Sequence, residues 1–126
     1  MAGNQQVILI GEPDPATTAL YQRALSTAFT VLAAPDEASL LQLLYTMPVA
    51  ALVLELALFP APGWDEVTAI SRVCAEQGVP LVVCSTLDER RRGLALGATA
   101  YLVKPTLPAT LLDTLREVME SKEHPA

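Results

Sequence analysis

Short apolar segments alternate with longer segments of helical period along the sequence. This alternation restricts the possible folds more than any other feature of the sequence does. The repeated unit is a strand followed by a helix, and the chain holds five of these units. Strands are expected at Val7–Ile10, Thr30–Ala33, Ala51–Leu54, Leu81–Cys84 and Ala100–Val103. Because such units are joined by right-handed crossovers, the pattern predicts an α/β fold: a doubly wound (βα)5 flavodoxin-like parallel sheet with strand order 2-1-3-4-5.

Capping residues and prolines mark where the intervening helices begin and end. Asp14 with Pro15 is a favourable start, since Asp caps the first turn and proline is tolerated at the first helical position. The second helix is expected from near Asp36 to before Pro48, and the third from about Trp64 to Gln77. The fourth is expected from Asp88 to Leu96 and the fifth from Pro108 to about Lys122. Their period predicts buried stripes that include Leu20, Tyr21, Ala24, Leu25 and Ala28 in the first helix and Leu40, Leu41, Leu44 and Met47 in the second.

The length and composition fit one domain with a large core. We expect residues 1–126 to form a single domain, with 121–126 as a polar tail or the stub of a linker. The chain is 52% hydrophobic, so it can bury a sizeable core. Its formal net charge of −6 opposes binding to phosphate backbones, so no nucleic-acid partner is expected.

The cysteines and the apolar segments indicate a cytoplasmic protein. Cys74 and Cys84 lie inside apolar stretches of two different elements, which is typical of reduced, buried thiols. Met1–Gln6 lacks the features of a signal peptide. The most apolar stretch, Val49–Phe59, is about half the roughly 20 residues that a membrane span needs, so no membrane association is expected.

Polar side chains follow four of the five expected strands. Glu12, Pro13 and Asp14 follow the first, Glu55 the third, Ser85 the fourth and Lys104 the fifth. Since the carboxyl ends of parallel strands meet at one edge of a sheet, this edge is the expected functional site.

One long segment resembles a known family. It runs Arg-Gly-Leu-Ala-Leu-Gly-Ala-Thr-Ala-Tyr-Leu-Val-Lys-Pro over residues 92–105. It is similar to the fourth helix, Gly-Ala turn, fifth strand and Lys-Pro ending of the receiver domain of bacterial two-component response regulators. Ser85, where the family has Ser or Thr, and Gly63, after the third strand, support the resemblance, which covers nearly the whole chain.

The resemblance also defines a phosphorylation pocket that this sequence changes. Family receivers accept a phosphoryl group on an Asp after strand three, beside a divalent cation held by two acids after strand one and by the acceptor. Here those acids fall on Glu12 and Pro13, and the acceptor falls on Glu55, which is one methylene longer than Asp. A misplacement of about 1 Å costs roughly 100-fold in such a step. We therefore expect a pseudo-receiver without catalytic activity or a cofactor, in which Glu12 and Glu55 are too few for a good magnesium site.

Each pocket residue also has a plainer interpretation. Glu55 could be a strand-end acid that faces solvent, and a register shifted by one residue would put Leu56 at the acceptor position. Lys104 is expected to pair with Glu55 or Glu12. Ser85 could act in the pocket or satisfy backbone groups of its loop, and Asp14 is expected to be a helix cap rather than a metal ligand.

The resemblance further implies a working surface. In the family the aromatic of the fifth strand, here Tyr101, reports the state of the pocket, and the face of the fourth helix, fifth strand and fifth helix carries protein contacts. We expect Tyr101 at the centre of this face, locked in one state. The partner would be a histidine kinase, an effector or a second copy of the chain in a homodimer.

Two other functions stay open. One is an orthodox response regulator in which a kinase still phosphorylates a side chain. The other is a flavodoxin-like domain that binds a nucleotide or flavin. The second is disfavoured because Gly11-Glu12-Pro13-Asp14 puts acids where a phosphate needs backbone amides.

Overall fold

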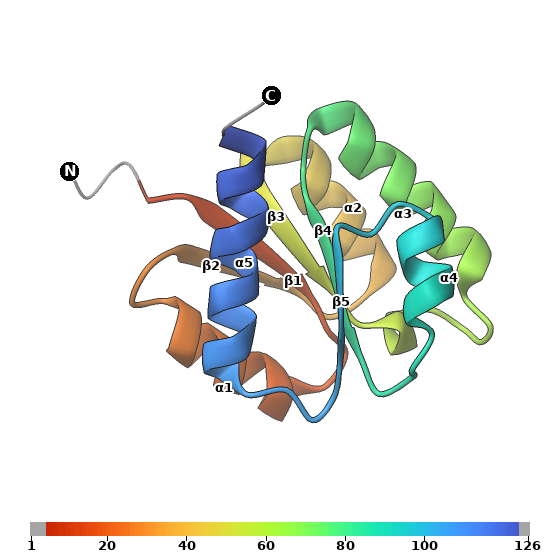
Figure 1. The fold of residues 1–126 in the computed structure, drawn as a ribbon, viewed down its shortest axis with the longest axis horizontal. Coiled ribbons are helices and arrows are strands. Elements are labelled where there is room, and N and C mark those ends of the chain that lie inside the picture. Colours follow the sequence, from red (N-terminus) through yellow and green to blue (C-terminus); the bar gives the residue numbers. More distant parts are fainter. Residues whose placement is uncertain (1–4, 124–126) are drawn as a thin grey trace.

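The computed structural model describes residues 5–123, with side chains to residue 120, and it has the predicted fold. One parallel sheet has the strand order β2-β1-β3-β4-β5 (Figure 1). The strands are β1 (Val7–Gly11), β2 (Thr30–Ala34), β3 (Val49–Leu54), β4 (Leu81–Ser85) and β5 (Ala100–Val103). The helices are α1 (Pro15–Leu25), α2 (Glu37–Thr46), α3 (Trp64–Gln77), α4 (Arg90–Ala95) and α5 (Pro108–Glu123), and the short 3-10 helix η2 (Leu56–Leu58) follows β3.

Helices cover both faces of the sheet, and each face has its own core. Alternate strand residues point to opposite faces. Leu52 and Leu54 pack with α2 and α3, while Ala51 and Val53 pack with α1 and α5. Burial on both sides explains why β1, β3 and β4 read as continuous apolar runs.

Local capping fixes the helix ends. The side chain of Asp14 accepts a hydrogen bond from the Thr17 amide at the start of α1, and Asp36 does the same for Ser39 in α2. Gly78 ends α3 with a φ of 69°, which is a left-handed conformation that glycine adopts without strain.

Two residues expected in the core are on the surface instead. Leu20 is 46% exposed and Met47 is 38% exposed. The buried positions of α1 are Tyr21 and Leu25, one turn apart, and Leu20 lies about 100° away from Tyr21 around the helix. Met47 follows α2 in an extended conformation, so the helical period no longer sets its direction.

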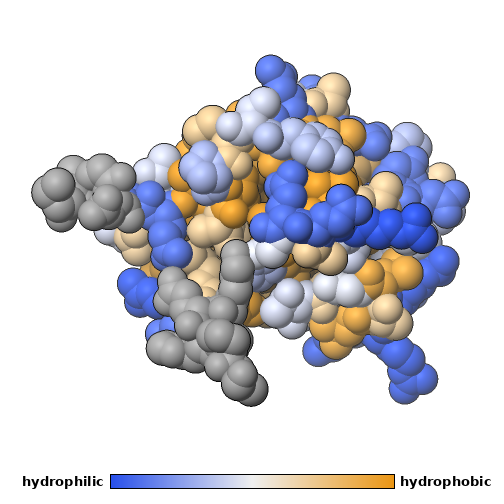
Figure 2. All heavy atoms as spheres, turned by 90° about the horizontal axis from the view of Figure 1, so that it is seen from above, coloured by the Kyte–Doolittle hydropathy of each residue, from blue (hydrophilic) through white to orange (hydrophobic). Residues whose placement is uncertain are grey.

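The surface of the described residues mixes polar and apolar side chains. From above the view of Figure 1, hydrophobic side chains show between hydrophilic ones (Figure 2). An open groove of about 580 Å³ lies beside the residues that precede β4 and β5, at the edge opposite to the polar strand ends. Cys74 borders this groove, and both cysteines are free and buried. Within residues 5–123 no helix combines the length and apolarity that crossing a bilayer requires.

Candidate functional site

Glu55 lies directly after β3, and its side chain turns into a polar pocket. Its amide donates to the carbonyl of Gly11, which continues the pairing of β3 with β1. Its Oε2 accepts hydrogen bonds from the Ser85 hydroxyl at 2.6 Å and from the Ala57 amide at 3.0 Å. The next residue, Leu56, packs into the apolar core, so the strand register presents Glu55 to the pocket. Glu55 is 5% exposed and does not face solvent.

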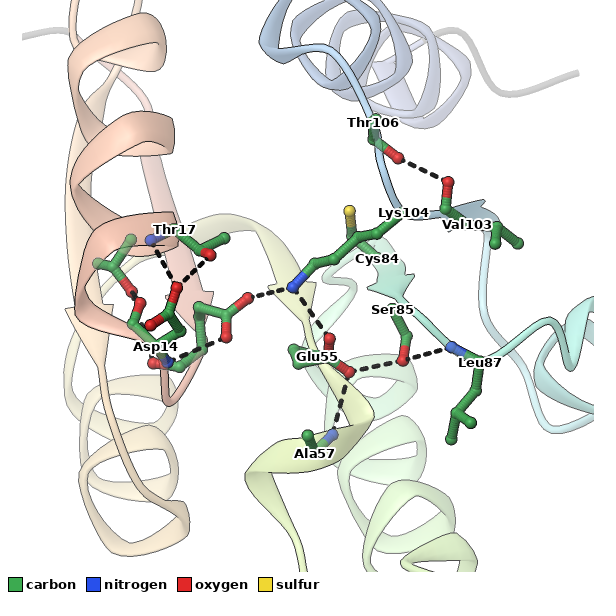
Figure 3. A network of polar contacts seen from close by, with 12 residues as sticks. Asp14, Thr17, Glu55, Ala57, Cys84, Ser85, Leu87, Val103, Lys104 and Thr106 are labelled. Carbon is green, nitrogen blue, oxygen red and sulfur yellow. Dashed lines mark hydrogen bonds and ion pairs between the residues drawn. The ribbon is translucent and has the colours of Figure 1, made fainter.

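Lys104 joins two acids that lie on different strand ends. It follows β5, and its Nζ is 2.6 Å from Glu12 Oε1 and 2.9 Å from Glu55 Oε1. Figure 3 shows its side chain reaching from the end of β5 toward Glu55. The side chain of Lys104 is 15% exposed, and those of Glu12 and Glu55 are 4% and 6% exposed. This is a largely buried arrangement of two acids around one ammonium group.

Glu12 is also fixed through its backbone and through both carboxylate oxygens. Its amide donates to the carbonyl of Ala34 at the end of β2. Its Oε2 accepts from the Asp14 amide at 3.1 Å, while its Oε1 binds Lys104. All four carboxylate oxygens of Glu12 and Glu55 therefore have a hydrogen-bond partner.

The contacts decide the charge state of the pocket. Burial is the largest influence on Glu55 and raises its pKa, but hydrogen bonds from Ser85, Ala57 and Lys104 outweigh it, so the pKa ends below its ordinary value. Burial likewise works to lower the pKa of Lys104, but its hydrogen bonds to Glu12 and Glu55 raise it overall. Both Glu55 and Lys104 are charged at neutral pH.

A chain of hydrogen bonds leads from the pocket to Tyr101. Ser85 Oγ accepts from the Leu87 amide at 3.3 Å. The Tyr101 hydroxyl donates to the Leu87 carbonyl at 2.6 Å and accepts from the Glu89 amide at 3.3 Å. The loop between β4 and α4 is thus attached to the pocket at one end and to Tyr101 at the other.

The position of Tyr101 corrects one expectation. The residue is 7% exposed, so its side chain cannot be the centre of an exposed contact surface. The ring lies against Gly93 of α4, where a Cβ would come within 2.5 Å of the ring. The missing side chain of Gly93 is therefore what allows the inward position.

Pro13 and Asp14 lie at the margin of the pocket, although they were expected among the pocket residues from the sequence. Both are exposed. The Asp14 side chain accepts from the amide and the hydroxyl of Thr17, and these bonds lower its pKa. Since capping α1 occupies this carboxylate, only the Asp14 amide contributes to the pocket.

A buried pair beside the pocket was not predicted from the sequence. The Tyr21 hydroxyl lies 3.5 Å from Cys84 Sγ. Burial, and then the contact with Cys84, raise the pKa of Tyr21. A signal was present in the sequence, because Cys84 precedes Ser85 and Tyr21 falls on the buried stripe of α1. Nothing in the sequence said which strand α1 covers.

The pocket does not fit the magnesium ion that the family resemblance implies. Magnesium prefers six oxygen ligands in near-octahedral geometry. Over the part of the chain that the structure describes, no three His, Cys, Asp or Glu side chains gather so that they could hold a metal. Between Glu12 and Glu55 lies the ammonium of Lys104.

Comparison with known proteins finds relatives that are transcriptional regulatory proteins. No protein-family model matches the chain. The probable transcriptional regulatory protein SilR of Salmonella typhimurium is 32% identical over 116 residues, which are 89% of this chain and 50% of that protein. The transcriptional regulatory protein CusR of Escherichia coli K12 is 31% identical over 116 residues, with the same coverage. The chain spans about half the length of the curated relatives it matches.

Solved structures agree in fold. A CheY-like response regulator receiver domain protein from Methanospirillum hungatei JF-1 gives a TM-score of 0.83 at 19% identity, over 95% of this chain and 98% of that one. A response regulator from Thermotoga maritima gives 0.80 at 18% identity, over 93% and 99%. The sheet and its polar strand ends define the class of doubly wound, CheY-like α/β domains. Together with the sequence similarity to SilR and CusR, they identify the chain as a receiver domain of two-component response regulators.

Proposed function

We propose that this receiver domain works without phosphorylation and signals through contacts with a protein partner. The observation that carries the proposal is the state of Glu55, which follows β3 where receivers that resemble this chain carry an acceptor Asp. Both of its carboxylate oxygens are already engaged, by Lys104 on one side and by Ser85 and the Ala57 amide on the other.

The chemistry of phosphoryl transfer supports this proposal. An acceptor oxygen has to reach phosphorus in line with the leaving group, and nearby cations have to neutralise the phosphoryl oxygens. Glu55 is longer than Asp, and its free attack would require breaking bonds to Ser85 or Lys104. Lys104, which in the family holds phosphoryl oxygens, is here committed to Glu12 and Glu55.

Incubation with acetyl phosphate and magnesium chloride, followed by intact mass, tests the proposal. The mass should not change, while a receiver domain that retains its Asp gains one phosphoryl group under the same conditions. A stable gain of one phosphoryl group that maps to residues 51–60 would instead establish the orthodox mechanism.

A fixed charge at Glu55 implies a fixed output. The ordinary receiver gains and loses negative charge at this position, whereas Glu55 keeps it at neutral pH. The hydrogen bonds through Ser85 and Leu87 then hold Tyr101 inward permanently. Control would come from the presence or concentration of the partner.

The face formed by α4, β5 and α5 is the proposed contact surface, for a histidine kinase, an effector or a second copy of the domain. Its apolar area comes from exposed leucines and not from Tyr101. Leu94 on α4 is 48% exposed, and Leu107, just before α5, is 72% exposed. Two free, buried thiols further support a cytoplasmic location, and we expect no enzymatic activity of the domain itself.

A further inference from the structure

We propose that the groove beside the starts of β4 and β5 binds a small apolar carboxylate, such as a medium-chain fatty acid, and that Arg72 pairs with its carboxylate group. The groove lies at the edge of the sheet opposite to Glu55, so this site is separate from the polar pocket. It does not depend on whether the domain is phosphorylated. Three properties support it: the size of the groove, the chemistry of its walls and the position of Arg72.

The groove has the size of a small-molecule site. Its walls come from the second half of α3, from the turns that precede β4 and β5, and from Val118 of α5. Figure 2 looks onto this edge of the sheet, where hydrophobic side chains show between hydrophilic ones. The volume of about 580 Å³ falls within the range of about 300 to 1,000 Å³ that is typical of sites for small molecules.

The walls of the groove favour a ligand with an apolar body. Cys74, Val79 and Val118 line it and are buried. The backbone amides of the two turns already donate within the chain, that of Val79 to the Cys74 carbonyl at 2.8 Å and that of Thr99 to the Leu81 carbonyl at 2.7 Å. These amides are therefore not available to bind a phosphate group, which disfavours a nucleotide as the ligand.

The opposite walls of the groove are joined by hydrogen bonds. The buried hydroxyl of Ser71 on α3 donates to the Leu96 carbonyl at 2.7 Å, which fixes α3 against the end of α4. The Thr99 hydroxyl accepts from the Leu81 amide at 3.4 Å, so the turn before β5 is fixed to the start of β4. The groove is thus already formed without a ligand, and binding need not order its walls.

Arg72 gives the groove its preference for an anion. It is the one charged residue among the described residues that line the groove. Among the side chains that the structure describes, the ion pairs involve Lys104 and Arg90, and Arg72 has no acid within ion-pair distance. A guanidinium group pairs with a carboxylate through two parallel hydrogen bonds. An apolar molecule with one carboxylate therefore complements both the walls and the single cation.

NMR titration with octanoate and with octanol tests the proposal, because the two probes share one apolar chain and differ in charge. Octanoate should shift the amide signals of Ala75, Gly78 and Gly97 in a saturable way, since these residues line the groove. It should bind the wild type about two- to fivefold more tightly than octanol, as expected for an exposed ion pair. In Arg72→Gln this preference should disappear, while the affinity for octanol stays the same.

Ala75→Trp, which places a large side chain in the groove, should abolish the saturable shifts with both probes. Ala19→Trp is the matched control, because Ala19 is also an exposed helical alanine but lies on α1, away from the groove. This variant should bind both probes as the wild type does. If Ala75→Trp does not fold, the comparison of the wild type with Arg72→Gln decides.

Three results would overturn the proposal. The first is equal affinity of the wild type for octanoate and octanol. The second is a set of saturable shifts that a folded Ala75→Trp leaves unchanged, or that fall outside the groove. The third is a change in the groove signals on raising the protein concentration without any response to octanoate, which would make the groove a contact between two copies of the domain.

Discussion

The hydroxyl of Ser85 donates a hydrogen bond of 2.6 Å to Oε2 of Glu55, across the ends of two neighbouring strands. Both residues are buried, and the same hydroxyl accepts from the Leu87 amide. Ser85 is thus the link between the acid of the pocket and the loop that leads to Tyr101.

Replacing Ser85 with Ala should therefore lower the free energy of unfolding by about 1.5 to 3 kcal/mol, the range for a hydrogen bond to a charged group. The chain contains a matched control. Ser39 donates to Asp36 over the same 2.6 Å but at an exposed site, so Ser39→Ala should cost at most about 0.5 kcal/mol. Urea denaturation measures both, and equal losses would show that burial of the Glu55 contact contributes nothing.

The lowered pKa of Glu55 predicts the acid limb of the stability profile. Unfolding releases its hydrogen bonds and returns the carboxyl to a value near 4.5. Above that value the stabilisation is fully present, and it is lost as the pH falls through the lower pKa of the folded state. Glu55→Gln should flatten this acid limb in urea denaturation between about pH 5 and pH 3. An unchanged limb would place the titrating group elsewhere.

The raised pKa of Lys104 predicts how stability falls at alkaline pH. Its pKa is raised in the folded state above the ordinary value of 10.5. The stabilisation from its ion pairs is fully present below the ordinary value and is lost as the pH rises through the folded pKa. Lys104→Met should remove this alkaline contribution, and denaturation between about pH 10 and pH 12 measures it. An identical alkaline loss in the variant would contradict the assignment.

Gly93→Ala should drive Tyr101 from its inward position. The new Cβ would lie 2.5 Å from the ring, so we expect a loss of about 1 to 3 kcal/mol. In a Tyr101→Ala background the same change should cost nothing, because alanine is the better helix former. The double-mutant cycle isolates the contact, and additive losses would mean that the ring and α4 are independent.

Association should depend on the exposed leucines of the proposed contact surface. Leu94→Ser and Leu107→Ser should each weaken association by about 1 kcal/mol or more and leave the melting temperature nearly unchanged. Leu20→Ser is the control, since Leu20 is exposed to a similar degree as Leu94 but lies on α1, which is not part of the proposed contact surface. Sedimentation or pull-down with the partner measures the effect. An equal loss from Leu20→Ser would move the contact surface to another face.

The strands and the pocket side chains could be predicted because both follow from local pattern. Continuous apolar runs mark strands covered on two sides, and the residue after each run falls at one edge whatever the helices do. This is why Glu55 and Lys104, 49 positions apart, could be grouped in advance. The side chain of Asp14 could not be assigned so simply, because capping and metal binding compete for the same carboxylate.

The inward ring of Tyr101 and the Tyr21–Cys84 contact depend on how helices dock on the sheet. An apolar strand residue looks the same in sequence whether a helix covers it or not. Tyr101 is buried because α4 has no side chain at Gly93. This burial depends on how α4 packs on β5 and cannot be seen in the sequence of either element alone. Exposure of Leu20 has a similar origin, since the rotation of α1 is set by Tyr21 and Leu25 against the sheet and α5.

The contact between α4 and α3 gives the molecule an intrinsic reporter. The guanidinium of Arg92 lies 4.4 Å from the ring centre of Trp64, which is the only tryptophan in the sequence. Indole emission responds to a change in its immediate surroundings, so fluorescence of the unlabelled protein senses whether α4 stays docked on α3. Binding of a partner to α4 should therefore change the tryptophan emission spectrum. In Arg92→Ala, which lacks the contact with Trp64, partner binding should no longer change the emission.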